Sequence, residues 1–192
     1  MSSMFDVVLS FLIGGMLLIS MFTAMTTIQA HAINQKIYFN MMANSLNVGK
    51  ILKGYYLARL GIKHTGNPIT SATSNSFRFW TYIVNPSTGS ESDMDVTIAE
   101  RVIGGQKAIL VYRANHPAQR LYGPFNIDNN GLVIRYYDKD DNIITNPSAN
   151  LSAIRAVEIG FHRIREGINI SSNSPFNITN YVYFKKYLIN LF

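Results

Sequence analysis

The stretch FDVVLSFLIGGMLLISMFTAMTTIQAHAINQ, residues 5–35, decides how the rest of the chain is interpreted. Between Asp6 and Lys36 there is no Lys, Arg, Asp or Glu. A helix that crosses the hydrocarbon core of a bilayer needs about 20 predominantly apolar residues, so this run is long enough to span a membrane. Small and hydroxylated residues interrupt it, among them Gly14 and Gly15, and such residues let helices pack closely. The stretch predicts a membrane helix that also has protein neighbours.

The residues on either side of the apolar run bear on targeting and orientation. A cleavable signal peptide begins with positive charge and has a shorter apolar core. The opening MSSMFD carries no positive charge, so we expect a retained anchor. The positive-inside tendency, taken alone, favours a cytoplasmic C-terminal domain, because positive residues follow the run at Lys36, Lys50, Lys53, Arg59 and Lys63.

The composition of the 192-residue chain excludes several classes of function. The net charge of +6 comes from scattered residues, with no dense basic run and no nucleic-acid-binding motif, so we expect no nucleic-acid partner. The chain has no Cys, which excludes disulfides, a thiol nucleophile and Cys-ligated metals. Its 11 Tyr and 11 Phe suit β-strands and contact surfaces.

Helical periodicity continues beyond the apolar run. Apolar residues recur at helical spacing from Ile37 to Leu60, with Asn and Lys between them, and Gly61 is the expected stop. A helix from Phe5 to Leu60, rising about 1.5 Å per residue, is longer than a bilayer is thick. Its second half must therefore bury its apolar stripe against the remaining domain. We expect three parts: the transmembrane or assembly half of the helix (1–35), its amphipathic half (36–62) and a β-rich globular domain (63–192).

The remaining chain predicts an antiparallel β domain. Polar composition predicts loops over Ile69–Ser76 and Asn115–Pro124, and Gly104-Gly105-Gln106 suits a tight hairpin. Strand-like runs lie between the turn signals, at Phe77–Val84, Asp95–Ile103, Lys107–Ala114, Gly131–Asp138, Ala156–Arg165 and in the final YVYFKKYLI. The expected fold class is α+β, with a long N-terminal transmembrane helix packed on an antiparallel sheet.

This order of elements resembles type IV pilins and the pseudopilins of type II secretion systems. A more specific resemblance lies in GLVIRYYDKDDNIITNPSANLSAIRAVEIGF, residues 131–161. It is similar to J-type minor pseudopilins and PilW-like minor pilins, in which a strand ending in Tyr-x-Asp, a polar turn and a Leu-x-x-Ile-Arg segment lead into an alternating strand. The matching residues here are Tyr136, Tyr137, Asp138, Asn142, Leu151, Ile154, Arg155, Val157 and Ile159. The resemblance implies a pilin-like fold and a domain outside the cytoplasmic membrane.

The resemblance also implies an assembly role for Asp6, Gly14 and Gly15. The family places a Glu at the fifth mature position, which Asp6 would occupy if Met1 were removed, and pairs it with the N-terminal amine of a neighbouring subunit. A charge in an apolar helix bundle needs such a partner. Alternatively, Asp6 is a solvated N-cap at the positive end of the helix. Gly at this depth either loosens the helix during assembly or serves close helix packing.

His and acidic residues give little support for a metal site. The four His are not at ligand spacing, so we expect no zinc site. Asp138-x-Asp140-x-Asn142 imitates the start of a calcium loop, but Ile143 replaces the turn Gly and no closing Glu follows, which excludes an EF-hand. A looser calcium site there is weighed against a polar β-turn, which we favour. Glu91, Asp93 and Asp95 are expected to form a solvated acidic turn.

No catalytic constellation is recognisable, and we expect neither enzyme activity nor a cofactor. The aromatic tail, with Tyr181, Tyr183, Phe184, Tyr187 and Phe192, is expected to form a buried final strand rather than an interface. The sequence predicts a structural subunit that assembles with copies of itself or other pilin-like subunits, in the inner membrane with an extracytoplasmic domain or in an extracellular filament. The alternative is a membrane-tethered binding module for carbohydrate or peptide.

Overall fold

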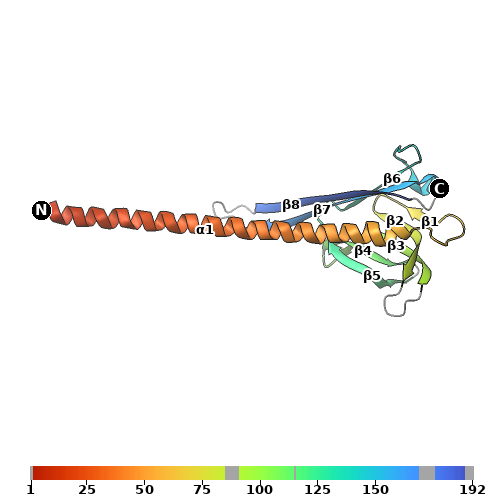
Figure 1. Cartoon of the computed structure of the whole chain (residues 1–192), viewed down its shortest axis with the longest axis horizontal. Coiled ribbons are helices and arrows are strands. Elements are labelled where there is room, and N and C mark those ends of the chain that lie inside the picture. The colour runs from red at the N-terminus through yellow and green to blue at the C-terminus, as the bar shows by residue number, and fades with distance from the viewer. Residues whose placement is uncertain (1, 85–90, 115, 169–175, 189–192) are drawn as a thin grey trace. The chain divides into compact units, whose positions relative to one another are not determined.

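The computed structural model describes residues 2–84, 91–114, 116–168 and 176–188 (Figure 1). Helix α1 spans Ser2–Lys50, a π-helical turn follows over Ile51–Tyr56, and a 3-10 turn covers Leu57–Arg59. Leu60 is extended, with φ −61° and ψ 129°, and Gly61 has a φ of 75°, so the helical path ends where the sequence predicted. The helical path is continuous to Arg59, as expected, and beyond Lys50 it widens into the π turn.

Within the described residues, eight strands form two sheets. The five-stranded sheet has the order β1-β2-β3-β4-β5, all neighbours antiparallel, and the three-stranded sheet has the order β6-β7-β8. The strands are β1 (Ile69–Ala72), β2 (Ser76–Val84), β3 (Glu91–Ile103), β4 (Gln106–Arg113), β5 (His116–Asn126), β6 (Leu132–Tyr137), β7 (Ala156–Gly167) and β8 (Phe176–Tyr187). The α+β class, with a long apolar N-terminal helix and antiparallel sheets, is confirmed.

Two segments expected to be loops are strands. Ile69–Ala72 forms β1 and His116–Asn126 forms β5, and these are the two edges of the five-stranded sheet. An edge strand needs only one hydrogen-bonded side, so it tolerates Pro and polar residues that would be excluded from a central strand. The predicted hairpin is confirmed, because Ile103 pairs with Gln106 and both Gly104 and Gly105 have positive φ.

The expected acidic turn is also wrong, because its residues lie in β3. Asp95 is buried, and its carboxylate accepts hydrogen bonds from Arg78 Nε at 2.9 and 3.1 Å. Asp93 Oδ2 lies 2.7 Å from His64 Nδ1. A buried carboxylate needs such a partner, and for Asp95 the partner lies on β2, directly beside β3 in the sheet.

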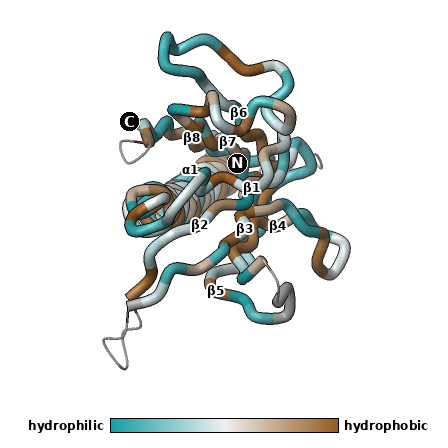
Figure 2. The backbone as a smooth tube through the Cα atoms, turned by 90° about the vertical axis from the view of Figure 1, so that its right-hand side faces the viewer, coloured by the Kyte–Doolittle hydropathy of each residue, from teal (hydrophilic) through white to brown (hydrophobic). Residues whose placement is uncertain are grey.

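One hydrophobic core joins the end of the helix to both sheets. Leu52 comes from the π turn, Phe77 from β2 and Ile159 from β7, and all three are fully buried. Figures 1 and 2 show the two sheets on either side of the C-terminal part of the helix. A buried carbonyl at the end of the π turn also has a partner, since Thr81 Oγ1 donates to the Tyr56 carbonyl at 2.8 Å. The second half of the helix therefore buries its apolar stripe, as its periodicity predicted.

Polar contacts connect the sheets. The Tyr136 hydroxyl on β6 donates to the Thr73 carbonyl at 2.8 Å, at the turn between β1 and β2. At the start of β6, the backbone N–H of Leu132 donates to Glu100 Oε2 of β3 at 2.7 Å. Gly131 has a φ of 78°, and a Cβ there would collide with the Glu100 carboxylate. Burial raises the pKa of Tyr136 well above its usual range.

The chain divides into two compact units. One comprises Met1–Asn40 with Arg165–Ile178, and the other comprises Met41–Ile164 with Thr179–Phe192. The core and these connections between the sheets lie in the second unit.

Candidate functional site

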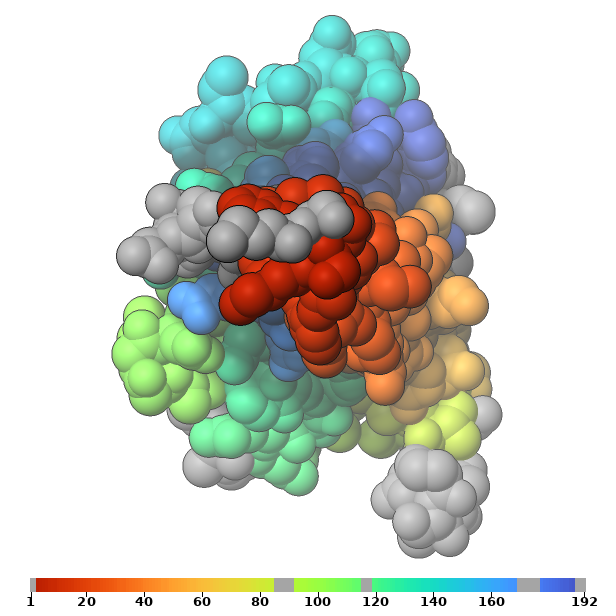
Figure 3. All heavy atoms as spheres, turned by 90° about the vertical axis from the view of Figure 1, so that its left-hand side faces the viewer, coloured from red at the N-terminus to blue at the C-terminus, as the bar shows by residue number. Residues whose placement is uncertain are grey.

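The most extensive exposed apolar surface in the described residues is the first part of α1. Large apolar side chains are exposed from Met4 to Phe39, with Phe11 79% and Phe22 68% exposed. Within residues 3–40, Ala30 alone is buried. By length and composition, this helix is the one in the described residues that could cross a membrane. Figure 3 views the molecule from the N-terminal end of this helix.

Asp6 lies within this surface and does not cap the helix. Because α1 begins at Ser2, Asp6 is more than one turn inside it, and the N-cap alternative does not hold. Its side chain is exposed, and its backbone carbonyl accepts a hydrogen bond from Ser10 Oγ at 2.8 Å. A carboxylate on an otherwise apolar surface is available to a charged group outside the chain.

Gly14 and Gly15 leave a shallow gap in the apolar surface. Both are half-exposed, and a Cβ added at either position would meet nothing within 4 Å. The space beside them is therefore open within this chain, as close approach of another helix requires. Further along the helix the hydroxyls bond to the helix's own backbone, since Thr23 Oγ1 donates to the Ile19 carbonyl and Thr27 Oγ1 to the Thr23 carbonyl.

Asn34 makes the most specific polar contact of the first unit. Its Nδ2 donates to the Ile168 carbonyl at 2.9 Å, and its Oδ1 accepts from the Ile168 N–H at 2.8 Å. One side-chain amide thus satisfies both backbone groups of a residue 134 positions away. No local pattern in the sequence marks Asn34 for this role.

Residues of the C-terminal block 131–161 lie together in space. The Arg155 N–H donates to the Tyr137 carbonyl at 2.7 Å, and Ile154 is fully buried in the core. Arg155 Nη1 donates to the Ser152 carbonyl at 2.7 Å, and Leu151 packs against the core as a half-buried residue. These residues hold the junction between β6 and β7.

Within the same block, Val157 and Ile159 both point into the core. This confirms the predicted inward alternation of β7.

The Asp138 turn has the geometry of a polar β-turn. Asp138 Oδ1 accepts the backbone N–H groups of Asp140 and Asn142, each at 2.9 Å, and these bonds hold the pKa of Asp138 below its usual value. Its other oxygen accepts from the Asn142 amide at 3.3 Å. These bonds fit the polar β-turn that the sequence favoured. In the part of the chain that the structure describes, no group of three or more His or acidic side chains could hold a metal.

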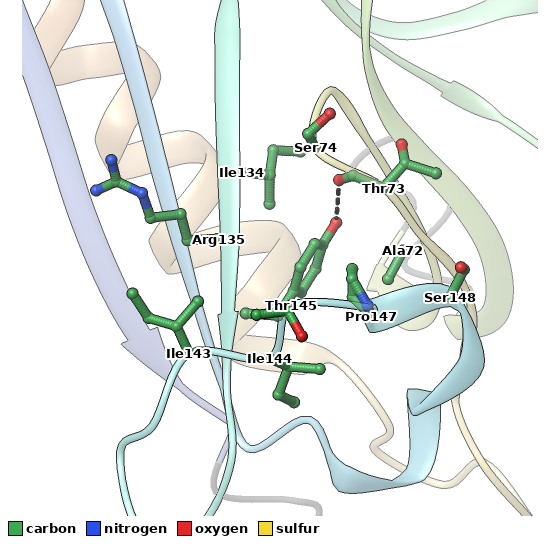
Figure 4. A pocket seen from close by; sticks show the side chains of 11 residues that line it. Ala72, Thr73, Ser74, Ile134, Arg135, Ile143, Ile144, Thr145, Pro147 and Ser148 are labelled. Atoms are coloured by element: carbon green, nitrogen blue, oxygen red, sulfur yellow. Dashed lines mark hydrogen bonds between the residues drawn. The ribbon is translucent and has the colours of Figure 1, made fainter.

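Small pockets lie among the described residues of the second unit, and two of them have a well-defined lining. The larger, of about 360 Å³, lies between the β1–β2 turn, β6 and residues 143–148, with Thr73, Ser74, Ile143 and Thr145 among its lining (Figure 4). Its cationic lining residue, Arg135, is bound to Glu158 at 3.0 Å. The smaller, of about 250 Å³, is lined mainly by residues of α1 and β5. Neither lining contains a nucleophile paired with a base.

The fold is similar to that of a solved pilin structure. This is the type IV-like pilin TTHA1219 from Thermus thermophilus, which is 9% identical in sequence; the match covers 79% of this chain and 98% of that chain, with a TM-score of 0.47. No protein-family model matches the chain, and no curated protein matches it significantly. So low an identity and TM-score establish no family.

Proposed function

We propose that the chain is a pilin-like structural subunit that assembles through the first half of α1, alongside copies of itself or other pilin-like subunits, into a filament or pseudopilus-type envelope machine. One observation carries this proposal. Residues 3–39 expose apolar side chains on a helix whose continuation is fixed in the core of a folded β domain. Apolar surface of that extent needs an environment outside the chain, either lipid or other helices.

The proposal assigns a role to each part of the chain. Residues 1–35 form the assembly and membrane half of the helix, residues 36–62 join it to the domain, and residues 63–192 form the outer domain. Asp6 pairs with a cationic group of a neighbouring subunit, and Gly14 and Gly15 accommodate close packing of that neighbour. The subunit resides in the inner membrane with its domain outside the cytoplasm before it enters an assembly. It has no catalytic role.

Cross-linking tests this assignment directly, because the chain contains no Cys. Ile13→Cys places one thiol on the exposed helix, next to Gly14. If helices pack side by side, mild oxidation in native membranes yields covalent dimers. The matched control is Thr65→Cys, an exposed position after the helix, which should yield none. A chain that remains monomeric at both positions would favour a solitary membrane anchor over an assembly subunit.

Asp6→Asn tests the charge pairing. Loss of a paired charge from an apolar bundle should reduce the Ile13→Cys cross-link, because the partner's cation would be left without its counter-charge. Asp140→Asn, in an exposed turn, is the matched control and should leave cross-linking unchanged. Equal cross-linking in both variants would refute the role of Asp6 while leaving helix packing intact.

A further inference from the structure

The outer face of the three-stranded sheet displays tyrosines that the sequence led us to expect in the core. Tyr181, Tyr183 and Tyr187 on β8 are 51%, 62% and 51% exposed, which contradicts the expected buried strand. Strand alternation sends the intervening Val182 and Phe184 toward the core instead. We call the three exposed residues the tyrosine face. Phe192 lies outside the described residues.

The rings of the tyrosine face contact one another and the neighbouring strand β7. A Cβ at Gly160 on β7 would come within 2.7 Å of the Tyr181 hydroxyl, so the missing side chain leaves room for this ring to lie across the strand. The ring of His162 lies 4.3 Å from that of Tyr181, centroid to centroid. The Tyr181 and Tyr183 rings are nearly parallel, with an interplanar angle of 8° and centroids 6.3 Å apart. Rings fixed in this way lose little conformational freedom when a ligand stacks on them.

Four charged side chains beside the tyrosine face are paired with one another. Arg135 Nη1 lies 3.0 Å from Glu158 Oε1, and Lys185 forms an ion pair with Asp141. Lys185 Nζ also lies 3.5 Å from the centroid of the Tyr137 ring, and the Tyr137 hydroxyl donates to Glu158 Oε2 at 2.7 Å. These two cations and two carboxylates sum to zero. These four charged groups are therefore already engaged. The exposed rings and the hydroxyls of Tyr181 and Tyr183 remain for recognition, whereas the Tyr187 hydroxyl donates to Asp141 Oδ1 at 3.4 Å.

We propose that the tyrosine face binds a neutral oligosaccharide. A sugar ring has an apolar side of C–H groups, which suits the face of an aromatic ring, and a rim of hydroxyls, which suits the phenol hydroxyls and the paired charges nearby. Two parallel rings on alternate residues of one strand present successive platforms for successive sugar units. A nucleic acid is disfavoured because phosphate binding needs uncommitted cationic groups. The site lies on the β domain, does not involve the exposed helix, and goes beyond the proposed assembly function.

An array of neutral and charged oligosaccharides, probed with the detergent-solubilised full chain, tests the proposal. The wild type should bind neutral glycans, and the double variant Tyr181→Ala/Tyr183→Ala should lose about tenfold in affinity. Tyr183→Phe keeps the ring and should retain most of the binding. Val102→Ala, which is 68% exposed on the other sheet, is the matched control and should bind as the wild type does.

Three outcomes would overturn the proposal: no binding to any neutral glycan, binding confined to charged glycans, or binding that survives the double variant. Chemical nitration of the tyrosines in the wild type, with and without bound glycan, tests the site without any substitution. A bound glycan should protect Tyr181 and Tyr183, and unchanged nitration of both would count against the site. Because the double variant should keep the Ile13→Cys cross-link, failure here is distinguishable from failure of the assembly proposal.

Discussion

The two halves of the N-terminal helix have similar apolar side chains in opposite surroundings. Leu17 is 59% exposed, whereas Leu52 is fully buried. In the first half, apolar residues occur on all sides, so no single contact within the chain could cover them. In the second half they form a stripe that both sheets cover. The distribution of apolar residues around the helix, more than their number, separates the half that stabilises the domain from the half that needs a partner.

Truncation of one leucine in each half should give the largest contrast. Leu52→Ala removes buried methyl groups and leaves a cavity, so the free energy of unfolding of the β domain should fall by about 2–5 kcal/mol. Leu17→Ala should change it by less than about 0.5 kcal/mol, because that side chain contacts little within the chain. Urea unfolding in detergent, followed by tryptophan fluorescence of Trp80, measures both. Similar losses of unfolding free energy in the two variants would contradict the difference in burial between the two halves of the helix.

The junction between the sheets should be the next most sensitive point of the buried region. Gly131→Ala places a Cβ against the Glu100 carboxylate at a positive φ, and we expect a loss of about 1–3 kcal/mol in the free energy of unfolding. Gly105→Ala is the matched control, because Gly105 has nearly the same φ, 80°, but a Cβ there meets nothing within 4 Å. The difference between the two variants isolates the collision from the backbone strain. If they are equally stable, the Glu100 contact does not constrain the junction.

Tyr136→Phe should have a smaller effect, with a signature in pH. Loss of the hydrogen bond to the Thr73 carbonyl should lower the free energy of unfolding by about 1 kcal/mol at neutral pH. The raised pKa of Tyr136 keeps it protonated in the folded state, while in the unfolded state it ionises near 10.0. Its contribution is therefore fully present below pH 10.0 and is lost as the pH rises above that value.

Removal of this hydroxyl should accordingly make stability fall less steeply above pH 10.0. Urea unfolding across that range measures the slope. Tyr183→Phe, at an exposed ring, is the control and should preserve the slope of the wild type. Identical slopes in the wild type and Tyr136→Phe would contradict burial of the Tyr136 hydroxyl.

Substitution of Asn34, in the first half of the helix, should give the smallest and most local effect, a change in hydrogen exchange at one amide. Asn34→Ala removes both hydrogen bonds to Ile168, so hydrogen exchange of the Ile168 amide should accelerate while the buried amide of Ile159 exchanges unchanged. Asn40→Ala, at an exposed position of the same helix, is the control. Equal exchange at Ile168 in the wild type and Asn34→Ala would show that the contact does not hold in solution.

Elements with a complete local pattern could be predicted from the sequence. The helix end followed from Gly61, and the inward face of β7 followed from the alternation of Val157, Ile159 and Phe161, all fully buried. Asp95 was misjudged because its partner, Arg78, becomes its neighbour only when β2 and β3 pair. The edge strands β1 and β5 were missed because an edge tolerates polar residues and Pro.

The candidate sites show the same limit. The alternation of side chains along β8 correctly places Tyr181 and Tyr183 on one face and Val182 and Phe184 on the other. It does not predict which of the two faces of this edge strand turns toward the core. The core lies on the side of Val182 and Phe184. Asn34 had no local signal at all, because its partner lies 134 residues away. The functional assignments of Asp6, Gly14 and Gly15 depend on a neighbouring molecule and so remain proposals.

The central claim is that residues 5–35 are covered by neighbouring helices in an assembly. Electron cryo-microscopy of the complex extracted from native membranes tests it most directly. The account predicts ordered copies whose N-terminal helices form a common apolar core, with Asp6 beside a cationic group and the β domains outside. A monodisperse monomer, with lipid or detergent around residues 5–35 and no ordered neighbour, would contradict it.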